Sequence, residues 1–103
     1  MKVDHYESGN LYGVRYEMGS GEELPKHTHP ITEFHNVCVL KGSVTFWSED
    51  RVAMLTAGNI FDFDGTKPHV ITALEPTVIL NLYRFGKPPS AMKLSEAEKH
   101  FNV

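Results

Sequence analysis

Short runs of apolar and β-branched residues recur along this chain, and each is followed within a few residues by a turn sequence. The runs cover residues 11–17, 34–40, 43–48, 51–55, 59–63, 69–73 and 77–85. Such runs are typical of strands, and the Gly, Asn, Asp and Pro residues between them are typical of turns. None of these runs is interrupted by a segment with the 3.6-residue period of a helix. Many short strands with close-set turns predict an all-β sandwich or barrel.

The composition indicates one small domain and argues against several kinds of partner. The chain has 103 residues, 41% of them hydrophobic, which is enough for one modest core. Its formal net charge is −3 and no basic cluster is present, so we expect neither nucleic acid nor an anionic membrane as a partner. We also expect no signal peptide and no membrane span, because the chain has no long apolar run. The single cysteine, Cys38, favours a reducing, cytoplasmic setting.

The last part of the chain has a different pattern. Lys87-Pro88-Pro89 cannot continue a central strand, because proline has no N–H to donate to a ladder. Ser95 is followed three residues later by Glu98, which is the spacing of a helix capping box. This spacing predicts a short helix over residues 96–102. We therefore expect a β-barrel over residues 1–86, with residues 87–103 forming a partly helical tail of the same domain.

Four of the six histidines lie where strands of a small barrel can bring them together. His27 and His29 are two residues apart, and alternate side chains of an extended segment share a face. His35 and His69 each lie at the start of a predicted strand. Histidines on different strands can converge on one point inside a barrel. The alternative is a set of unrelated surface histidines, which a His-x-His pair alone does not exclude.

The spacing around these histidines resembles the two sequence motifs of the cupin superfamily. The first motif is a glycine, five residues, His-x-His, three or four residues, a glutamate, six residues and a glycine. In this chain Gly21 is followed by five residues and then by His27-Thr28-His29, and a glycine follows at position 42. Two motifs in the right order rarely arise by chance, so a match to the second motif makes the resemblance much more specific.

The second motif is a glycine, five residues, Pro-x-Gly, two residues, a histidine, three residues and an asparagine. Gly58 is followed by five residues, then by Asp64-Gly65-Thr66 in the Pro-x-Gly position, and His69 comes two residues later. Ala73 replaces the asparagine. Asp-Gly is itself a good turn former, so these departures leave the expected fold unchanged. The resemblance implies a cupin-type double-stranded β-helix, or jelly-roll barrel, to which the capping box adds a short C-terminal helix.

One position of the first motif does not match. Counted forward from His29, Glu33 takes the place of the glutamate, but it then lies eight residues before Gly42 instead of six. Counted back from Gly42, His35 takes that place. A strand's register is fixed by its turn and its buried face, whereas a loop absorbs insertions, so we place the two extra residues in the loop. The resemblance then implies four metal ligands: His27, His29, His35 and His69. Glu33 would lie beside the metal, as a base or as the partner of an imidazole.

A site of four imidazoles has a distinct chemistry. Imidazole nitrogen suits zinc, iron, copper and nickel, and we expect one divalent transition metal, with manganese also a candidate. Four neutral imidazoles leave the full +2 charge on the site, which favours a small anionic ligand and promotes ionisation of bound water or of an enolisable substrate. Four protein ligands can also complete a purely structural tetrahedral site. Catalysis would therefore need a larger coordination shell or one loosely held histidine.

The resemblance implies more than one function. Small cupins include dioxygenases, isomerases, lyases and cyclases, while others bind small ligands or sugars without catalysis. We expect a metal-dependent enzyme of the dioxygenase or isomerase and cyclase type, and a non-catalytic ligand-binding or sensor cupin is the alternative. Glu33 and Tyr83 are the candidate catalytic residues for acid–base chemistry. A homodimer through the N-terminal strand and outer sheet is also expected, because cupins commonly dimerise in this way.

Overall fold

Every regular element in the described part of the chain is a β-strand. The computed structural model describes residues 1–8, 11–27, 34–64 and 67–84. They form nine strands: β1 (Lys2–Ser8), β2 (Leu11–Met18), β3 (Glu23–His27), β4 (Phe34–Lys41), β5 (Ser43–Ser48), β6 (Val52–Thr56), β7 (Ile60–Asp62), β8 (His69–Ala73) and β9 (Thr77–Arg84). The all-β prediction is confirmed. No helix in these ranges has the length and hydropathy needed to cross a membrane. The helix predicted over residues 96–102 and the tail from residue 87 lie outside the described residues.

Seven of these strands match the predicted runs to within one residue at each end, and two were not predicted. The missed strands are β1 and β3, and each lies at the edge of its sheet. In β1 most side chains are exposed, so its sequence shows no apolar face. In β3 Pro25 argues against a central strand, and proline is tolerated at an edge. The ladder between β3 and β8 shifts register between Leu24 and His27, around this proline.

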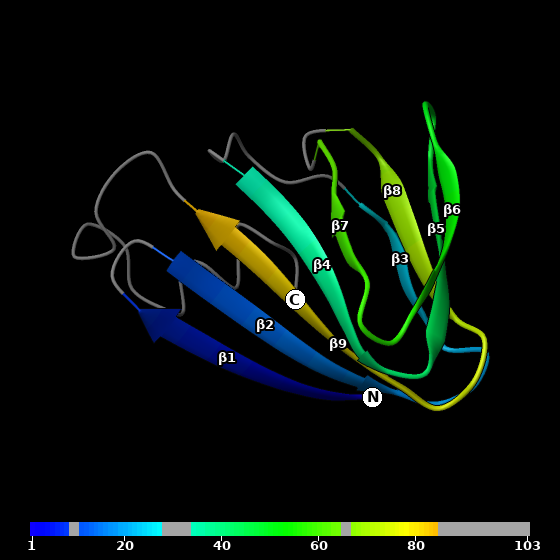
Figure 1. The fold of residues 1–103 in the computed structure, drawn as a ribbon, viewed down its shortest axis with the longest axis horizontal. Helices are drawn as coiled ribbons and strands as arrows, with labels where there is room; N and C mark the ends of the chain where they lie inside the picture. The colour runs from blue at the N-terminus through cyan, green and yellow to red at the C-terminus, as the bar shows by residue number, and fades with distance from the viewer. Residues whose placement is uncertain (9–10, 28–33, 65–66, 85–103) are drawn as a thin grey trace.

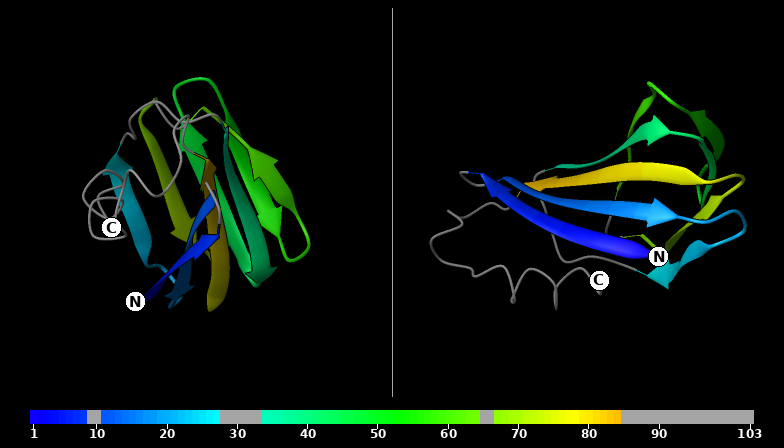
Figure 2. Two further views of the ribbon diagram at one scale, coloured as in Figure 1. Left: turned by 90° about the vertical axis from the view of Figure 1, so that its left-hand side faces the viewer. Right: turned by 90° about the horizontal axis from the view of Figure 1, so that it is seen from below.

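The strands form two antiparallel sheets that face each other (Figures 1 and 2). One sheet has five strands in the order β1-β2-β9-β4-β7, and the other has four in the order β3-β8-β5-β6. The chain changes sheet at every connection between consecutive strands except β1 to β2 and β5 to β6. Two facing sheets linked in this way form the jelly-roll arrangement predicted from the sequence.

The core lies between the two sheets and is built from the alternate residues that point inward. Its apolar members are Tyr12, Val14, Tyr16, Met18, Leu24, Val37, Val39, Val44, Phe46, Leu55, Phe61, Phe63, Ile71, Ala73 and Ile79. Phe46 is fully buried, and burial of a side chain of this size stabilises the fold by about 1.5–3 kcal/mol. Among the described residues, six polar ones are buried beside them: His35, Ser43, Ser48, His69, Thr77 and Asn81. Buried polar groups need partners or a function.

The turn at Gly42 fixes how β4 enters the five-stranded sheet. Gly42 has a φ of 85°, which side chains other than glycine rarely adopt. A Cβ at this position would also collide with Thr77 and with the Pro76 carbonyl oxygen. Beside it, the Ser43 N–H donates to the Thr77 hydroxyl oxygen at 3.2 Å, and that hydroxyl lies 2.7 Å from the Glu75 carbonyl oxygen. The end of β4 is therefore held against the start of β9.

The register of β4 against β9 decides which side chains share the interior. His35 lies opposite Tyr83, Val37 opposite Asn81 and Val39 opposite Ile79. His35, Val37 and Val39 are all at most 2% exposed, while Cys38 between them is half-buried on the other face. His35 therefore faces the interior, as predicted, and Cys38 faces away from it.

Candidate functional site

Two buried histidines, one from each sheet, meet inside the fold. His35 lies near the start of β4 in the five-stranded sheet, and His69 is the first residue of β8 in the four-stranded sheet. Each is only 1% exposed. Their ring centres are 5.6 Å apart and the rings are nearly perpendicular, at 81°. The fold thus brings together two of the four predicted metal ligands.

Aromatic rings surround this pair. The ring of Phe63 lies 4.1 Å from the centre of the His35 ring and 4.9 Å from that of His69. Phe46 stacks on His69 at 6.0 Å with an angle of 19° between the planes. Apolar surroundings disfavour a charged imidazolium, and only the neutral imidazole binds a metal. Phe46 and Phe63 belong to the hydrophobic core and also contact the histidine pair. Trp47, the other aromatic residue on β5, is exposed instead.

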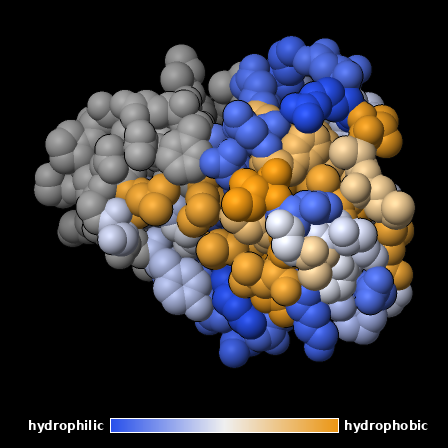
Figure 3. Space-filling model, viewed as in Figure 1, coloured by the Kyte–Doolittle hydropathy of each residue, from blue (hydrophilic) through white to orange (hydrophobic). Residues whose placement is uncertain are grey.

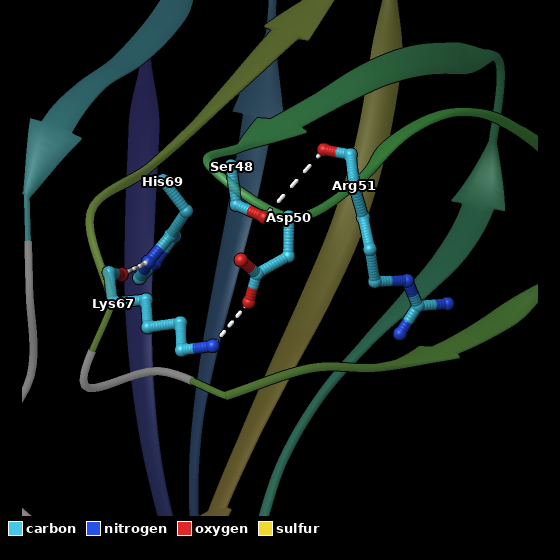
Figure 4. A network of polar contacts seen from close by, with 5 residues as sticks. All are labelled: Ser48, Asp50, Arg51, Lys67 and His69. Atoms are coloured by element: carbon cyan, nitrogen blue, oxygen red, sulfur yellow. Dashed lines mark hydrogen bonds and ion pairs between the residues drawn. The ribbon is translucent and has the colours of Figure 1, made fainter.

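A backbone carbonyl orients the His69 ring. The Nδ1 atom of His69 is 2.8 Å from the carbonyl oxygen of Lys67 (Figure 4). A carbonyl oxygen can only accept a hydrogen bond, so Nδ1 carries the ring proton and the lone pair is on Nε2. This is the arrangement by which proteins fix the tautomer of a metal-binding histidine.

The segment that carries Lys67 is tied to the turn between β5 and β6. The Lys67 ammonium forms an ion pair with Asp50, and this hydrogen bond raises the pKa of Lys67 (Figure 4). The turn itself is closed by Ser48, whose N–H donates to the Arg51 carbonyl oxygen at 2.8 Å. The ion pair between Lys67 and Asp50 thus ties the carbonyl that orients His69 to the β5–β6 turn. The Lys67 ammonium is thus engaged by Asp50.

Arg51 connects the same turn to the five-stranded sheet. Its guanidinium donates to the Asp62 carbonyl oxygen at 2.9 Å and lies 4.2 Å above the ring of Phe61. A cation above an aromatic face is attracted by the ring, by about 0.5–1 kcal/mol at an exposed site. Phe61 in turn packs on Phe46 at 4.8 Å. Arg51 therefore contacts, through Phe61, the Phe46 ring that stacks on His69.

The remaining predicted site residues are placed only in part. The backbone of His27 on β3 lies directly opposite His69, and that of Tyr83 on β9 lies directly opposite His35. His29 and Glu33 lie outside the described residues. Among the side chains that are described, no group of three or more His, Cys, Asp or Glu is placed to hold a metal. The ligand set and the roles of Glu33 and Tyr83 therefore stay predictions.

Comparison with solved structures identifies the fold. No protein-family model matches the sequence, and no curated protein matches it. An RmlC-like cupin protein from Desulfovibrio desulfuricans superposes with a TM-score of 0.72 and 27% identity, covering 81% of this chain and 80% of that one. The chain has the fold of a small cupin domain. A cupin superfamily protein from Desulfitobacterium hafniense has a TM-score of 0.69 at 14% identity, covering 82% of this chain and 78% of that one.

A third similar structure belongs to a regulatory protein. The cupin domain of an XRE-family transcriptional regulator from Enterobacter cloacae has a TM-score of 0.66 and 15% identity to this chain. The match covers 84% of this chain and 97% of that domain. At this identity the likeness shows the shared cupin fold.

His35 and His69 are spaced as two ligands of one metal ion would be. A metal lies about 2.0–2.1 Å from an imidazole nitrogen, so two imidazoles on one ion have ring centres roughly 4.5–6 Å apart. The 5.6 Å between His35 and His69 is within that range. The hydrogen bond from Nδ1 to the Lys67 carbonyl makes Nε2 the nitrogen of His69 that a metal would use. His27, opposite His69 on the neighbouring strand, is at a suitable backbone position to join them.

One interior polar residue of this cupin was missed from the sequence. Asn81 is 2% exposed and lies on the inner face of β9, two residues after the buried Ile79. The signal was present, because Asn81 is the only polar residue between Val78 and Leu82. A lone polar residue at an inward position of an apolar strand is informative, since burial of an amide is unfavourable without a partner.

Proposed function

We propose that this cupin holds one divalent transition metal at His27, His29, His35 and His69 and acts as an enzyme on a small anionic or enolisable molecule. The observation that carries the proposal is the buried His35–His69 pair, with the tautomer of His69 fixed by the Lys67 carbonyl. The metal would supply Lewis acidity or oxygen chemistry. The choice between a dioxygenase and an isomerase, cyclase or lyase depends on which metal is bound.

The protein's own residues would supply the environment of that reaction. Phe46 and Phe63 exclude water from the side of the histidine pair that they cover, which strengthens electrostatic interactions there. Glu33 and Tyr83 are proposed to move protons, and the backbone position of Tyr83 opposite His35 supports its part. We propose a cytoplasmic location, which the single cysteine, Cys38, supports.

The alternative is a non-catalytic sensor that binds a small ligand with or without a metal. The similarity to the cupin domain of a transcriptional regulator supports this possibility. The two functions share the same interior site and differ in whether the bound molecule is converted. A metal-loaded chain that binds small carboxylates but converts none of a panel of enolisable or oxygen-reactive compounds would favour the sensor.

Elemental analysis of protein purified without added metal tests the proposal. We expect close to one metal per chain, with iron favouring oxygen chemistry and zinc or nickel favouring proton transfer. His35→Gln and His69→Gln should each lose most of the metal, whereas Glu33→Ala should keep it. His5→Gln is the matched control, because His5 is on β1 and two strands separate β1 from β4. Circular dichroism confirms that each variant is folded before its metal is measured.

Two results would contradict this assignment. Metal that survives His35→Gln but disappears in Glu33→Ala would make Glu33 the ligand and the four-histidine set wrong. A wild-type chain with no metal, and with no change in melting temperature on chelation, would remove the metal from the function altogether.

We also propose a homodimer through the outer face of the five-stranded sheet. An apolar groove of about 300 Å³ lies there, lined by residues that include Tyr6, Leu11, Leu40, Leu80 and Leu82. Leu40 is 53% exposed and Tyr6 is 50% exposed. Figure 3 shows hydrophobic residues across the centre of one face of the molecule. Exposed apolar surface of this kind is typical of interfaces.

Light scattering after size exclusion measures the dimer directly. Leu40→Glu places a charge in the groove and should give a monomer. The control is Met54→Glu, because Met54 is 68% exposed on β6 of the other sheet. A monomer with Met54→Glu and a dimer with Leu40→Glu would place the interface on the other sheet, and a monomeric wild type would exclude the dimer.

A further inference from the structure

Asn81 places an unsatisfied hydrogen-bond acceptor inside the barrel. The residue is 98% buried, and its Oδ1 atom has no hydrogen-bond partner among the described residues. Its neighbours across the sheet on the same face are Val14 on β2 and Val37 on β4, neither of which can donate from its side chain. A buried acceptor without a partner typically destabilises a protein by about 1–3 kcal/mol. Leucine has the same number of side-chain heavy atoms and no polar atom to bury, so an asparagine here has a cost in stability that a ligand would explain.

The position of Asn81 is close to the histidine pair. Val37, directly opposite Asn81, is two residues from His35 on the same face of β4. Asn81 and His35 are therefore diagonal neighbours on one face of the sheet, and such neighbours are typically about 7–8 Å apart. Ile79, the next inward residue of β9 on the other side, is fully buried in the apolar core. Asn81 thus lies between the histidine pair and the apolar row that contains Ile79.

We propose that the side-chain carbonyl of Asn81 accepts a hydrogen bond from an O–H or N–H group of the molecule bound at the histidines. This inference rests on the proposed function, because it takes the His35–His69 pair as the point where the anionic end of that molecule binds. The ligand class is then a small molecule with an anionic group at one end and a hydroxyl or amine donor several bonds away. A dicarboxylate is disfavoured, since its second carboxylate would meet the carbonyl oxygen with no proton to donate.

Thermal unfolding of the metal-free protein tests whether the acceptor is unsatisfied. Asn81→Leu should raise the melting temperature by roughly 4–8 °C, the shift that about 1 kcal/mol produces in a domain of this size. The control is Asn36→Leu on the other face of β4, where the Asn36 amide already donates to Asp62 at 3.2 Å. It should not raise the melting temperature. A lower melting temperature for Asn81→Leu would mean that a structural water or another group already satisfies Asn81, and it would overturn the inference.

Binding of two matched probes tests the ligand role. The zinc-loaded chain is titrated with butyrate and with 4-hydroxybutyrate, which differ only by a hydroxyl group remote from the carboxylate. Wild type should bind the hydroxylated probe roughly 3–10-fold more tightly, the effect of one net hydrogen bond. Asn81→Leu should lose that preference while still binding butyrate, and Asn36→Leu should keep it.

The outcomes distinguish a failure of the ligand role of Asn81 from a failure of the proposed metal function. If the wild type binds both probes with equal affinity, or if Asn81→Leu keeps the preference, Asn81 has no ligand role and the proposed metal function is unaffected. If the wild type retains no zinc and binds neither probe, the proposed function fails, and the role of Asn81 fails with it.

Discussion

Replacing Gly42 with alanine should destabilise the fold far more than the same change at Gly58. Both glycines have positive φ angles, 85° and 92°, which cost a side-chain residue about 1–2 kcal/mol. They differ in surroundings. A Cβ on Gly42 would collide with Thr77 and the Pro76 carbonyl, whereas a Cβ on Gly58 would meet nothing within 4 Å.

At Gly42 only, the collision adds a further loss to the free energy of unfolding. Overpacking of this kind costs about 1–3 kcal/mol, so Gly58→Ala should lose about 1–2 kcal/mol and Gly42→Ala about 2–5 kcal/mol. Alanine also restricts the unfolded chain, but that effect is common to both variants and cancels in their comparison. Equilibrium urea denaturation measures both free energies of unfolding under the same conditions.

The difference between the two variants is the quantity that tests the reasoning. If they lose the same stability, the contact between the β4–β5 turn and the start of β9 does not constrain the fold. The register that places His35 would then need another cause. If Gly42→Ala fails to fold while Gly58→Ala folds, the constraint is stronger than the overpacking cost suggests.

Three further outcomes follow from the core, the thiol and the metal. Phe63→Ala should lower the free energy of unfolding by about 3–5 kcal/mol, because its ring packs on both His35 and His69, and Phe63→Leu should cost about 1.5 kcal/mol or less. Urea denaturation would show this, and a small cost for both variants would mean that the ring contacts contribute little to stability. Burial raises the pKa of the Cys38 thiol, so a smaller fraction is thiolate at pH 8.5 and iodoacetamide should react more slowly with the folded than with the urea-unfolded chain. Equal alkylation rates would contradict this. Chelation of a metal present at about 100 times its Kd should remove about 2.7 kcal/mol of stability, seen as a lower melting temperature, and an unchanged melting temperature would exclude a tightly bound metal.

The strands that could be predicted from the sequence are those that bury one face. Burial imposes alternation, and alternation is what a sequence pattern reports. The strands β1 and β3 were missed because an edge strand has a single neighbour and buries little, so polar residues and even Pro25 are tolerated. Their positions depend on the ladders that they extend, which are long-range contacts that no local pattern records.

The candidate site shows the same division. The inward position of His35 could be predicted because Gly42 and the buried face of β4 fix its register. The carbonyl of Lys67 beside His69 could not be predicted, because it depends on how the segment before β8 is held by Asp50 from another turn. Asn81 was missed for a different reason. It was read as part of an apolar strand, although a single polar residue at an inward position was the more informative fact.

On the inner face of the five-stranded sheet, the buried polar residues His35 and Asn81 lie in neighbouring rows, and the next row is apolar. Across β2, β9 and β4, the opposed backbone positions are Tyr12, Tyr83 and His35 in the first row, Val14, Asn81 and Val37 in the second, and Tyr16, Ile79 and Val39 in the third. The third row is part of the apolar core. It contributes burial on which the stability of the sheets depends, while the first row places a histidine where the opposite sheet places His69. In the second row, the buried amide oxygen of Asn81 lowers stability unless a bound group satisfies it. A molecule held between the histidines and Asn81 would therefore offset this cost.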